Sequence, residues 1–348
     1  MSHSEITRIK LDPWSSSSLL QKAIRRGHTA LAQQAAAALY KFRGQAIWRR
    51  LLNIAVEDVG IADLDLLWEV TRLATDRRLR EILGPEDELM LATCAKLALA
   101  PKDRSVDYVY CAATKLPASI EERSDLLAKS TADLISIAVN KREPQMKRLS
   151  AAMLACTEGR RCERLNAQAV AQLLAAMPRQ CPAALQQMIM TLAEQRSHPY
   201  PLTLVMLWSL YDWTGGSVGI SLEAERAPEW CGGVPLYTFD KHTALGKRAI
   251  GLLPSRCPEL SALLTQWVRP EQHADVARMA TYYADGAPVA RRLEWSFGRS
   301  LEFIGMHADM MSVGCPYEGV VPLIECVKQH LGLLNELRRA ALAGETPG

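Results

Sequence analysis

The sequence lacks the features of membrane-spanning, secreted and zinc-knuckle proteins. It has no run of about 18 apolar residues, which a transmembrane helix would require, and residues 1–14 lack the apolar stretch of a signal peptide. The nine cysteines include no Cys-x-x-Cys pair, so neither a metal knuckle nor a disulfide framework is expected. We therefore predict a cytoplasmic protein with reduced thiols, no membrane association and no metal site.

Signatures of nucleophilic and ATP-hydrolysing enzymes are absent as well. There is no Gly-x-Ser-x-Gly motif, and no cysteine lies in a recognised Cys/His pattern. A P-loop needs Gly-x-x-x-x-Gly-Lys-[Ser/Thr] to hold phosphates. The only Gly-Lys pair is Gly246-Lys247, with Lys241 at the first glycine position and Arg248 at the hydroxyl position. We expect no ATPase activity and no cofactor, and the sequence favours a protein that is not an enzyme.

What is present is the composition of a folded, mostly helical protein. The 348 residues are 49% hydrophobic and 23% charged, which supplies enough apolar surface for a core. Stretches rich in alanine and leucine repeat apolar residues at helical spacing. Asp63 and Thr243 are placed as helix N-caps, and Gly60 as a C-cap. We predict an all-α fold, as a multi-helix bundle or as stacked antiparallel helices, with one long loop rich in glycine and proline.

The helical spacing divides the chain into regions. Helices are predicted over 29–42, 46–60, 62–79, 85–100, 103–115, 119–140, 145–157, 164–177, 181–196, 201–213, 241–251, 258–267, 270–285, 288–304 and 318–343. The regions are an N-terminal arm (1–17), a first helical domain (18–140), a helical continuation (141–213), the Gly/Pro-rich loop (214–240) and a C-terminal helical domain (241–348) with a disordered tail. The serine run 15–18 predicts a short flexible entry after the arm.

Positive charge is concentrated near the N-terminus, although the formal net charge is only +3. Residues 1–56 contain only two acidic side chains, and arginine doublets recur at Arg25-Arg26 and Arg49-Arg50. Such a segment can contact nucleic-acid phosphates and release their counterions. Alternatively, the doublets stabilise helix ends and cover solvated helix faces.

Two motifs in the first third of the chain resemble a known family. In residues 38–63, a helix carrying Arg49-Arg50 runs into an acidic pair, a glycine, an alanine and an aspartate: Glu57, Asp58, Gly60, Ala62 and Asp63. A later helix ends in the Leu-Ala-Leu-Ala-Pro-Lys run 97–102. In this order, both motifs resemble the C-terminal helical part of the RarA/MgsA ATPases, clamp-loader-related AAA+ proteins of replication-fork maintenance. The resemblance covers about residues 18–116 and includes the stretch KAIRRG (22–27).

The resemblance implies an assembly state and partners for the chain, but not a catalytic activity. In the family this region lies beyond the ATPase core and supports oligomerisation, so it implies a homo-oligomer. It also implies DNA, or a replication or recombination protein, as a partner. Because the P-loop is missing, the chain resembles the helical collar without the motor.

Glu57 and Asp58 are unusual because they lie close to the C-terminal end of an apolar helix, where acidic groups oppose the helix dipole. Arg50 lies about two turns from Glu57 on one face. We therefore predict a structural ion pair of Glu57 and Asp58 with Arg50, or with Arg49. A metal site is the alternative, but it lacks further ligands in the sequence.

The stretch 239–248 is the second candidate site. With Thr243 as N-cap, Lys241, His242, Lys247 and Arg248 would surround a helix N-terminus, which suits a phosphate. Together with Arg25, Arg26, Arg49 and Arg50, these residues are our candidates for nucleic-acid or anion binding. Alternatively, Asp240, His242 and Lys247 serve a phosphate- or nucleotide-processing enzyme. The His-x-Asp pairs at 273–275 and 307–309, with His330, are not expected to bind metal, because residues two apart on a helix face different ways.

These observations favour one function over two others. The favoured hypothesis is a non-enzymatic DNA replication or recombination accessory protein that self-associates and binds DNA or a DNA-processing partner. The alternatives are the phosphate- or nucleotide-processing enzyme and a pure protein–protein scaffold. Salt-sensitive DNA binding would favour the first hypothesis.

Overall fold

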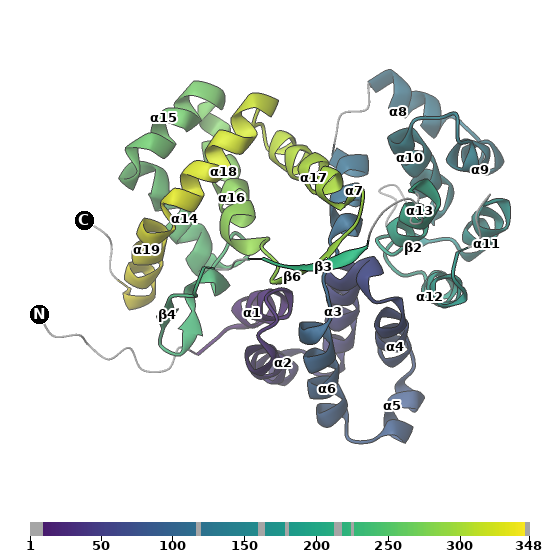
Figure 1. Ribbon diagram of the computed structural model, residues 1–348, viewed down its shortest axis with the longest axis horizontal. Helices are drawn as coiled ribbons and strands as arrows, with labels where there is room; N and C mark the ends of the chain where they lie inside the picture. Colours follow the sequence, from purple (N-terminus) through teal and green to yellow (C-terminus); the bar gives the residue numbers. More distant parts are fainter. Residues whose placement is uncertain are drawn as a thin grey trace, which may run out of the picture.

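The structure is a computed structural model that describes residues 10–115, 120–158, 164–177, 181–211, 218–223 and 226–344. Helices make up most of these residues and the strands form only short antiparallel pairs, which confirms the predicted all-α class. The helices gather in three groups that follow chain order, and α7 packs against α17 between them (Figure 1). None of the described helices has the length and hydrophobicity needed to cross a membrane.

The first group begins and ends its helices where the sequence offers caps. Its members are α1 (Pro13–Arg25), α2 (Thr29–Arg43), α3 (Ile47–Ile54), α4 (Leu64–Thr75), α5 (Arg77–Leu83) and α6 (Glu86–Leu99). The backbone N–H of Leu66 donates to the Asp63 carboxylate at 2.9 Å, which confirms Asp63 as N-cap. Gly60 ends the preceding helical segment with a φ of +52°, as predicted for a C-cap. The single helix predicted over 62–79 is wrong, because Asp76 ends α4 and caps α5.

The second group follows α7 (Ser105–Lys115). It consists of α8 (Ile120–Leu127), α9 (Thr131–Val139), α10 (Gln145–Ala155), β1 (Thr157–Glu158), β2 (Arg164–Leu165), α11 (Ala167–Ala176), α12 (Ala183–Glu194) and α13 (Leu202–Leu210). The continuous helix predicted over 119–140 is wrong, because Ser130 caps α9 by accepting from the backbone N–H of Asp133. The apolar faces of these helices belong to the same buried core as the rest of the chain.

The third group forms the C-terminal part of the described chain. It consists of the hairpin β4 (Trp230–Cys231) and β5 (Val234–Pro235), η4 (Leu236–Thr238), α14 (Ala244–Arg256), α15 (Pro258–Trp267), η5 (Pro270–Gln272), α16 (His273–Thr281), η6 (Tyr282–Gly286), η7 (Tyr317–Gly319), α18 (Val320–Gln329) and α19 (Leu331–Ala343). The Thr243 hydroxyl accepts from the backbone N–H of Gly246 at 3.0 Å, which confirms Thr243 as the N-cap of α14.

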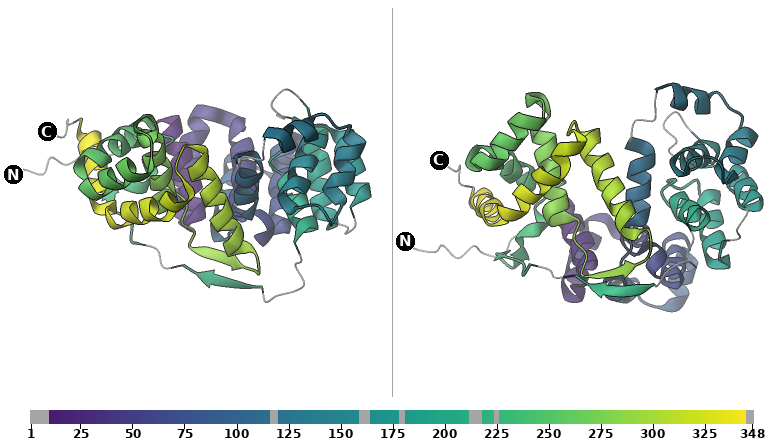
Figure 2. Two further views of the ribbon diagram at one scale, coloured as in Figure 1. Left: turned by 90° about the horizontal axis from the view of Figure 1, so that it is seen from above. Right: turned by 45° about the horizontal axis from the view of Figure 1, so that its top comes forward.

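Strand pairing and helix packing near Lys102 connect the end of the first group to α17 and to β6 (Arg291–Glu294). The strand β3 (Gly219–Leu222) pairs antiparallel with β6 along one side of the helices (Figure 2). The backbone of Lys102 bonds on both sides to β6, donating to Arg291 O and accepting from Leu293 N–H. Next to this bridge, α7 packs closely on α17 (Gly298–Ser312), where a Cβ added to Gly305 would lie 2.5 Å from the Cα of Tyr108. The helix before Lys102 is thus fixed to residues almost 200 positions later.

Two sequence predictions of local structure are wrong, and a third segment, the predicted loop, contains short strands. The serine run 15–18 is not flexible: it lies inside α1, which Asp12 caps and Pro13 begins, and three of its four serines are buried. The predicted helix 288–304 is replaced over 291–294 by β6. The predicted loop 214–240 contains β3, the β4–β5 hairpin and η4. The strand pairing of β3 and β6 is non-local, so periodicity within either segment does not reveal it.

Parts of the predicted arm (1–9) and tail (345–348) lie outside the described residues. The same holds for residues 214–217 and 224–225 of the predicted loop. The division into an N-terminal arm, two helical domains and a helical continuation stays a prediction.

Two helices continue into a wider π-helical turn, η2 (Ala55–Val59) after α3 and η6 after α16. Such turns occur frequently at functional sites. The guanidinium of Arg25 connects them, because it donates to Asp58 in η2 at 2.6 Å and to the carbonyl of Gly286 in η6 at 2.6 Å.

Candidate functional site

A charged cavity of about 320 Å³ lies where the first and third groups meet α7 and α17, and we call it the junction cavity. It is lined by side chains of α1, α3, η2, α7, the segment before α14, η6 and α17: Trp14, Ser17, Ser18, Gln21, Lys22, Arg25, Arg50, Glu57, Asp107, Cys111, Lys115, Asp240, Lys241, His242, Tyr282 and Asp309. Most of these side chains are ionisable, which is unusual for a cavity inside a helical protein.

The α1 wall of the junction cavity joins the N-terminus to the segment before α14. Lys22 donates to Asp240 at 2.6 Å and to the Ser18 hydroxyl at 2.7 Å, and Ser18 donates to the carbonyl of Thr238. The Lys22 and Asp240 side chains are only 4% and 5% exposed, so the ionised form of each is stabilised by the opposite charge of the other. Burial raises the pKa of Asp240, but Lys22 and His242 outweigh this effect and hold it at about 2.

The acidic pair in η2 is buried against arginines, but these differ from the predicted ones. Asp58 is fully buried and lies 2.6 Å from Arg25 and 3.2 Å from Arg104, and Glu57 lies 3.1 Å from Arg25. The predicted ion pair of Arg50 with Glu57 and Asp58 is therefore wrong. Arg50 instead donates to Gln21, which in turn donates to Asp58. The arginines that pair with the acids come from α1 and from the segment before α7, which spacing along one helix cannot reveal.

Burial splits the pKa values of these adjacent carboxyls. Burial and the charge of Asp58 raise the pKa of Glu57 to about 7, although Arg25 and Arg104 oppose the rise. Burial also acts on Asp58, but its hydrogen bonds and ion pairs with Arg25 and Arg104 lower its pKa below the usual range. The pair therefore holds one permanent negative charge and one carboxyl that titrates near neutral pH.

The opposite wall is formed by α7 and α17. Lys115 pairs with Asp309, which also accepts from the Tyr283 hydroxyl at 2.7 Å. Asp107 accepts from the Tyr200 hydroxyl at 2.9 Å and pairs with Arg104. The carboxylates on this side all have hydrogen-bond donors, so they offer no open cation site.

Two cations of the junction cavity have no carboxylate partner. Across the described parts of the chain, no carboxylate oxygen lies within 4.0 Å of Arg50 or Lys241. The Arg50 Nε is buried without a hydrogen-bond acceptor, and the Lys241 ammonium lies 4.2 Å from the centre of the Tyr282 ring. Burial lowers the pKa of both groups, which means that each would gain from a bound anion.

His242 lies beside these cations on the cavity wall. Partial enclosure, together with neighbouring Lys241 and Lys22, lowers its pKa to about 4, although Asp240 opposes the shift. The ring is therefore neutral near neutral pH, and its backbone N–H donates to Asp240 at 2.8 Å.

The structure brings half of the predicted anion-binding residues together. Arg25, Arg50, Lys241 and His242 line the junction cavity. The other four lie elsewhere: Arg49, Lys247 and Arg248 are exposed outside it, and Arg26 lines a second cavity, where its guanidinium lies 3.9 Å from the centre of the Tyr237 ring. The predicted cluster around the N-terminus of α14 is therefore divided, with Lys241 and His242 facing the cavity.

Sequence reasoning missed four charged residues of the junction cavity: Lys22, Asp107, Lys115 and Asp309. Of these, Lys22 and Lys115 each bring a cation onto a helix face that packs against other helices. Asp309 belongs to one of the His-x-Asp pairs, but its partner His307 bonds to Phe303 O instead of taking part in the site. The sequence signal that indicates such residues is the presence of ionisable side chains in helices that are otherwise apolar.

Comparison with known proteins gives one match. The family described as MgsA AAA+ ATPase C terminal matches residues 42–126, about a quarter of the chain. The match contains both quoted motifs, whereas the KAIRRG stretch precedes it. No curated protein and no solved structure matched the chain. Residues 42–126, which supply Arg50, Glu57, Asp107, Cys111 and Lys115 to the junction cavity, are therefore similar to the C-terminal region of MgsA-type AAA+ ATPases.

Proposed function

We propose that this chain is an accessory protein of DNA replication or recombination that binds a phosphate-bearing ligand, a nucleotide or a strand end, in the junction cavity. The observation that carries the proposal is the presence of Arg50 and Lys241 in one cavity without carboxylate partners among the described residues. Both residues are half-buried, so each charge is partly desolvated without a counter-charge, and a bound anion would offset that cost.

The chemistry of the cavity suits phosphate. A guanidinium and an ammonium supply several N–H donors, and a phosphate supplies several charged acceptor oxygens. The neutral ring of His242 adds a group that either donates or accepts a hydrogen bond, according to its tautomer. A volume of about 320 Å³ fits one nucleotide but excludes a duplex, so DNA would enter as an end or an unpaired base.

The family match supports the setting of the proposal. The MgsA/RarA-type segment relates the chain to AAA+ proteins of replication and repair, and that segment forms one wall of the cavity. A ligand bound there would contact both the family segment and the third group of helices. Its binding would therefore strengthen the contact between these two parts of the chain.

Calorimetric titration of the full chain tests the proposal. The ligands are inorganic phosphate, a nucleoside monophosphate and a short 5′-phosphorylated single strand, each at low and at high salt. We expect binding that weakens as salt rises. Lys241→Met keeps the length of the side chain but removes its charge, and should weaken binding at least about 10-fold, as loss of a charge-assisted hydrogen bond does.

Lys247→Met is the matched control, because Lys247 is an exposed lysine in the first turn of α14 and lies outside the cavity. It should leave the affinity unchanged. Equal weakening by both variants would indicate non-specific attraction to positive charge, and no binding of any ligand at low salt would also contradict the proposal.

A second candidate is phosphate or nucleotide processing in the same cavity. It is favoured by the pKa of about 7 for Glu57, since groups that titrate near neutral pH are suited to general acid–base catalysis. Asp240 and His242 share the cavity with Glu57, but Lys247, the third residue of the predicted enzyme, is exposed outside it. Turnover of a bound nucleotide that is lost in Glu57→Gln would support this candidate, and binding without turnover would refute it.

Self-association through the first helical group is the remaining part of the proposal. It is supported by the MgsA/RarA-type match and by exposed apolar side chains on that group, including Phe42, Ile82 and Leu99. Light scattering of the purified chain should show an oligomer. A monomer at all concentrations would remove self-association and leave ligand binding standing.

A further inference from the structure

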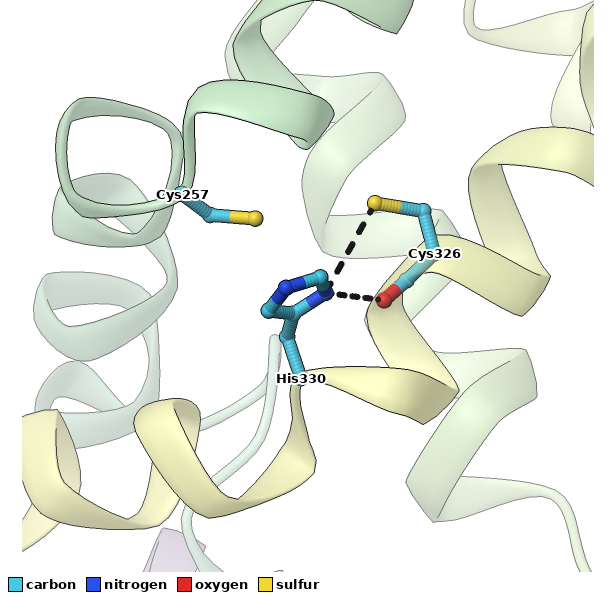
Figure 3. Close-up of side chains that lie close together, drawn as sticks. All are labelled: Cys257, Cys326 and His330. Carbon is cyan, nitrogen blue, oxygen red and sulfur yellow. Dashed lines mark hydrogen bonds between the residues drawn. The ribbon is translucent and has the colours of Figure 1, made fainter.

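Two cysteines and a histidine converge in the third group, far from the junction cavity. The sulfurs of Cys257 and Cys326 and a ring nitrogen of His330 all lie within 4.8 Å of one another. The His330 ring points between the two thiols (Figure 3). Cys257 and Cys326 are only 1% and 6% exposed. We call these three residues the thiol–imidazole cluster.

A carboxylate completes the surroundings of the cluster. The Glu259 carboxylate lies 3.3 Å from His330 Nε2, and the Cys257 thiol donates to it at 3.5 Å. The Glu259 side chain is 66% exposed and that of His330 is 29% exposed, so the cluster is open to solvent on this side. An ion can therefore reach two buried thiols through a polar entrance.

Both nitrogens of His330 have the environment that a metal-ligating histidine needs. Nδ1 lies 2.9 Å from the carbonyl oxygen of Cys326 and 3.9 Å from its sulfur. Nε2 faces Glu259. Whichever nitrogen binds a metal, the other retains an acceptor that fixes the tautomer of the ring, as is usual around metal-bound histidines.

We propose that the thiol–imidazole cluster is a binding site for a zinc-type divalent metal ion, with Cys257, Cys326 and His330 as ligands and Glu259 or water in the fourth position. Two thiolates and an imidazole are the ligand set of zinc, and hard cations such as magnesium prefer oxygen ligands. The separations need only small movements to reach tetrahedral contacts of about 2.3 Å to sulfur and about 2.0 Å to nitrogen.

The positions of the ligands in the fold explain what the metal would do. Cys257 lies between α14 and α15, while Cys326 lies in α18 and His330 follows it by one helical turn. Cys326 and His330 are four residues apart and so share a helix face. A metal ion would connect the α14–α15 corner to the α18–α19 corner and hold the third group together, independently of any ligand in the junction cavity.

The sequence did not predict this site because its ligands do not form a Cys-x-x-Cys pair. The two cysteines are 69 positions apart (326 − 257), and only the packing of α15 on α18 brings them together. The histidines of the His-x-Asp pairs, His273 and His307, lie outside the cluster and bond to the backbone carbonyls of Val268 and Phe303.

Metal titration of the reduced, metal-free full chain tests the proposal. We expect one equivalent of zinc to bind per chain in competition with a chromophoric chelator. Cobalt(II) should give the visible bands of a tetrahedral ion and a thiolate-to-metal charge-transfer band. Cys257→Ser and Cys326→Ser should each weaken the charge-transfer band, and His330→Gln should lower zinc affinity at least about 10-fold.

Cys231→Ser is the matched control, because Cys231 is a half-buried cysteine of β4 outside the cluster. It should bind metal like the unchanged chain. His330→Gln changes a partly exposed side chain and should retain the helical circular dichroism of the unchanged chain, so its loss of affinity would not reflect unfolding.

Three results would overturn the proposal. One is a reduced chain that shows no charge-transfer band with cobalt. Another is a band that persists unchanged in both cysteine variants. The third is a Cys257–Cys326 disulfide that forms in air while the reduced chain binds no zinc, which would make the cluster a redox pair instead of a metal site.

Discussion

Asp58 is the carboxylate on which two buried arginines converge, and Asp58→Asn tests how much this arrangement stabilises the fold. The Asp58 and Arg104 side chains are fully buried and Arg25 is 2% exposed, so solvent does not screen the pairs. Removing one partner of a buried ion pair costs about 3–5 kcal/mol, because it leaves uncompensated charge. Asparagine keeps the volume and one acceptor oxygen, so we expect a loss near the lower limit, about 3 kcal/mol.

The neighbouring carboxyl reduces this loss at neutral pH. The charge of Asp58 is one of the causes that raise the pKa of Glu57 to about 7. In Asp58→Asn that repulsion is gone, so the pKa of Glu57 should fall and Glu57 should supply negative charge to Arg25. The destabilisation should therefore be larger at about pH 5, where Glu57 is protonated and Asp58 is still ionised, than at about pH 7.

Urea unfolding followed by circular dichroism measures these changes. Asp65→Asn is the control, because Asp65 is an exposed aspartate of α4, and it should change stability by no more than about 0.5 kcal/mol. Arg25→Gln should destabilise strongly. Arg50→Gln loses a bond to Gln21 but also removes a cation without a carboxylate partner in the described parts of the chain, so its net cost should not exceed about 1 kcal/mol. A loss below about 1 kcal/mol in Asp58→Asn, or the reverse order for the arginine variants, would refute the account of this network.

Two further predictions concern packing and pH. Gly305→Ala should destabilise by about 1–3 kcal/mol, since a Cβ there would lie 2.5 Å from the backbone of α7. Gly332 in α19 has open space around its Cβ position, so Gly332→Ala should not lower the thermal midpoint of unfolding. Equal effects of the two variants would contradict the close packing of α7 on α17. Burial raises the pKa of Asp103 from 3.8 to about 6, so its ionised form is less stable in the folded chain. This group should therefore destabilise wild type relative to Asp103→Asn by about 2 kcal/mol more at about pH 7 than at about pH 4, and a pH-independent difference in urea unfolding would disprove it.

Local signals explain what the sequence predicted correctly. The caps at Asp63 and Thr243 act over three residues, and the C-cap at Gly60 needs only one backbone angle, so each is visible in a short stretch. Helical spacing likewise indicates the all-α class. The errors at 62–79 and 119–140 arise because a capping Asp76 or Ser130 interrupts a pattern whose apolar spacing continues.

Non-local contacts explain what the sequence did not predict. The arginine partners of Asp58 come from positions 25 and 104, and β6 becomes a strand only because β3 pairs with it. Of the residues expected for an anion site, Arg50, Lys241 and His242 line the cavity, and anion binding there stays a prediction. Which arginines and lysines face inward depends on how α1, α3 and the segment before α14 pack, and no single helix contains that information.

A crystal structure of the full chain grown with inorganic phosphate shows whether an anion occupies the junction cavity. Our proposal predicts a phosphate there, with its oxygens accepting hydrogen bonds from Arg50 and Lys241. It would be contradicted by a cavity that stays without phosphate at a concentration that saturates binding in solution. A phosphate bound only at the exposed Arg49, Lys247 or Arg248 would contradict it equally.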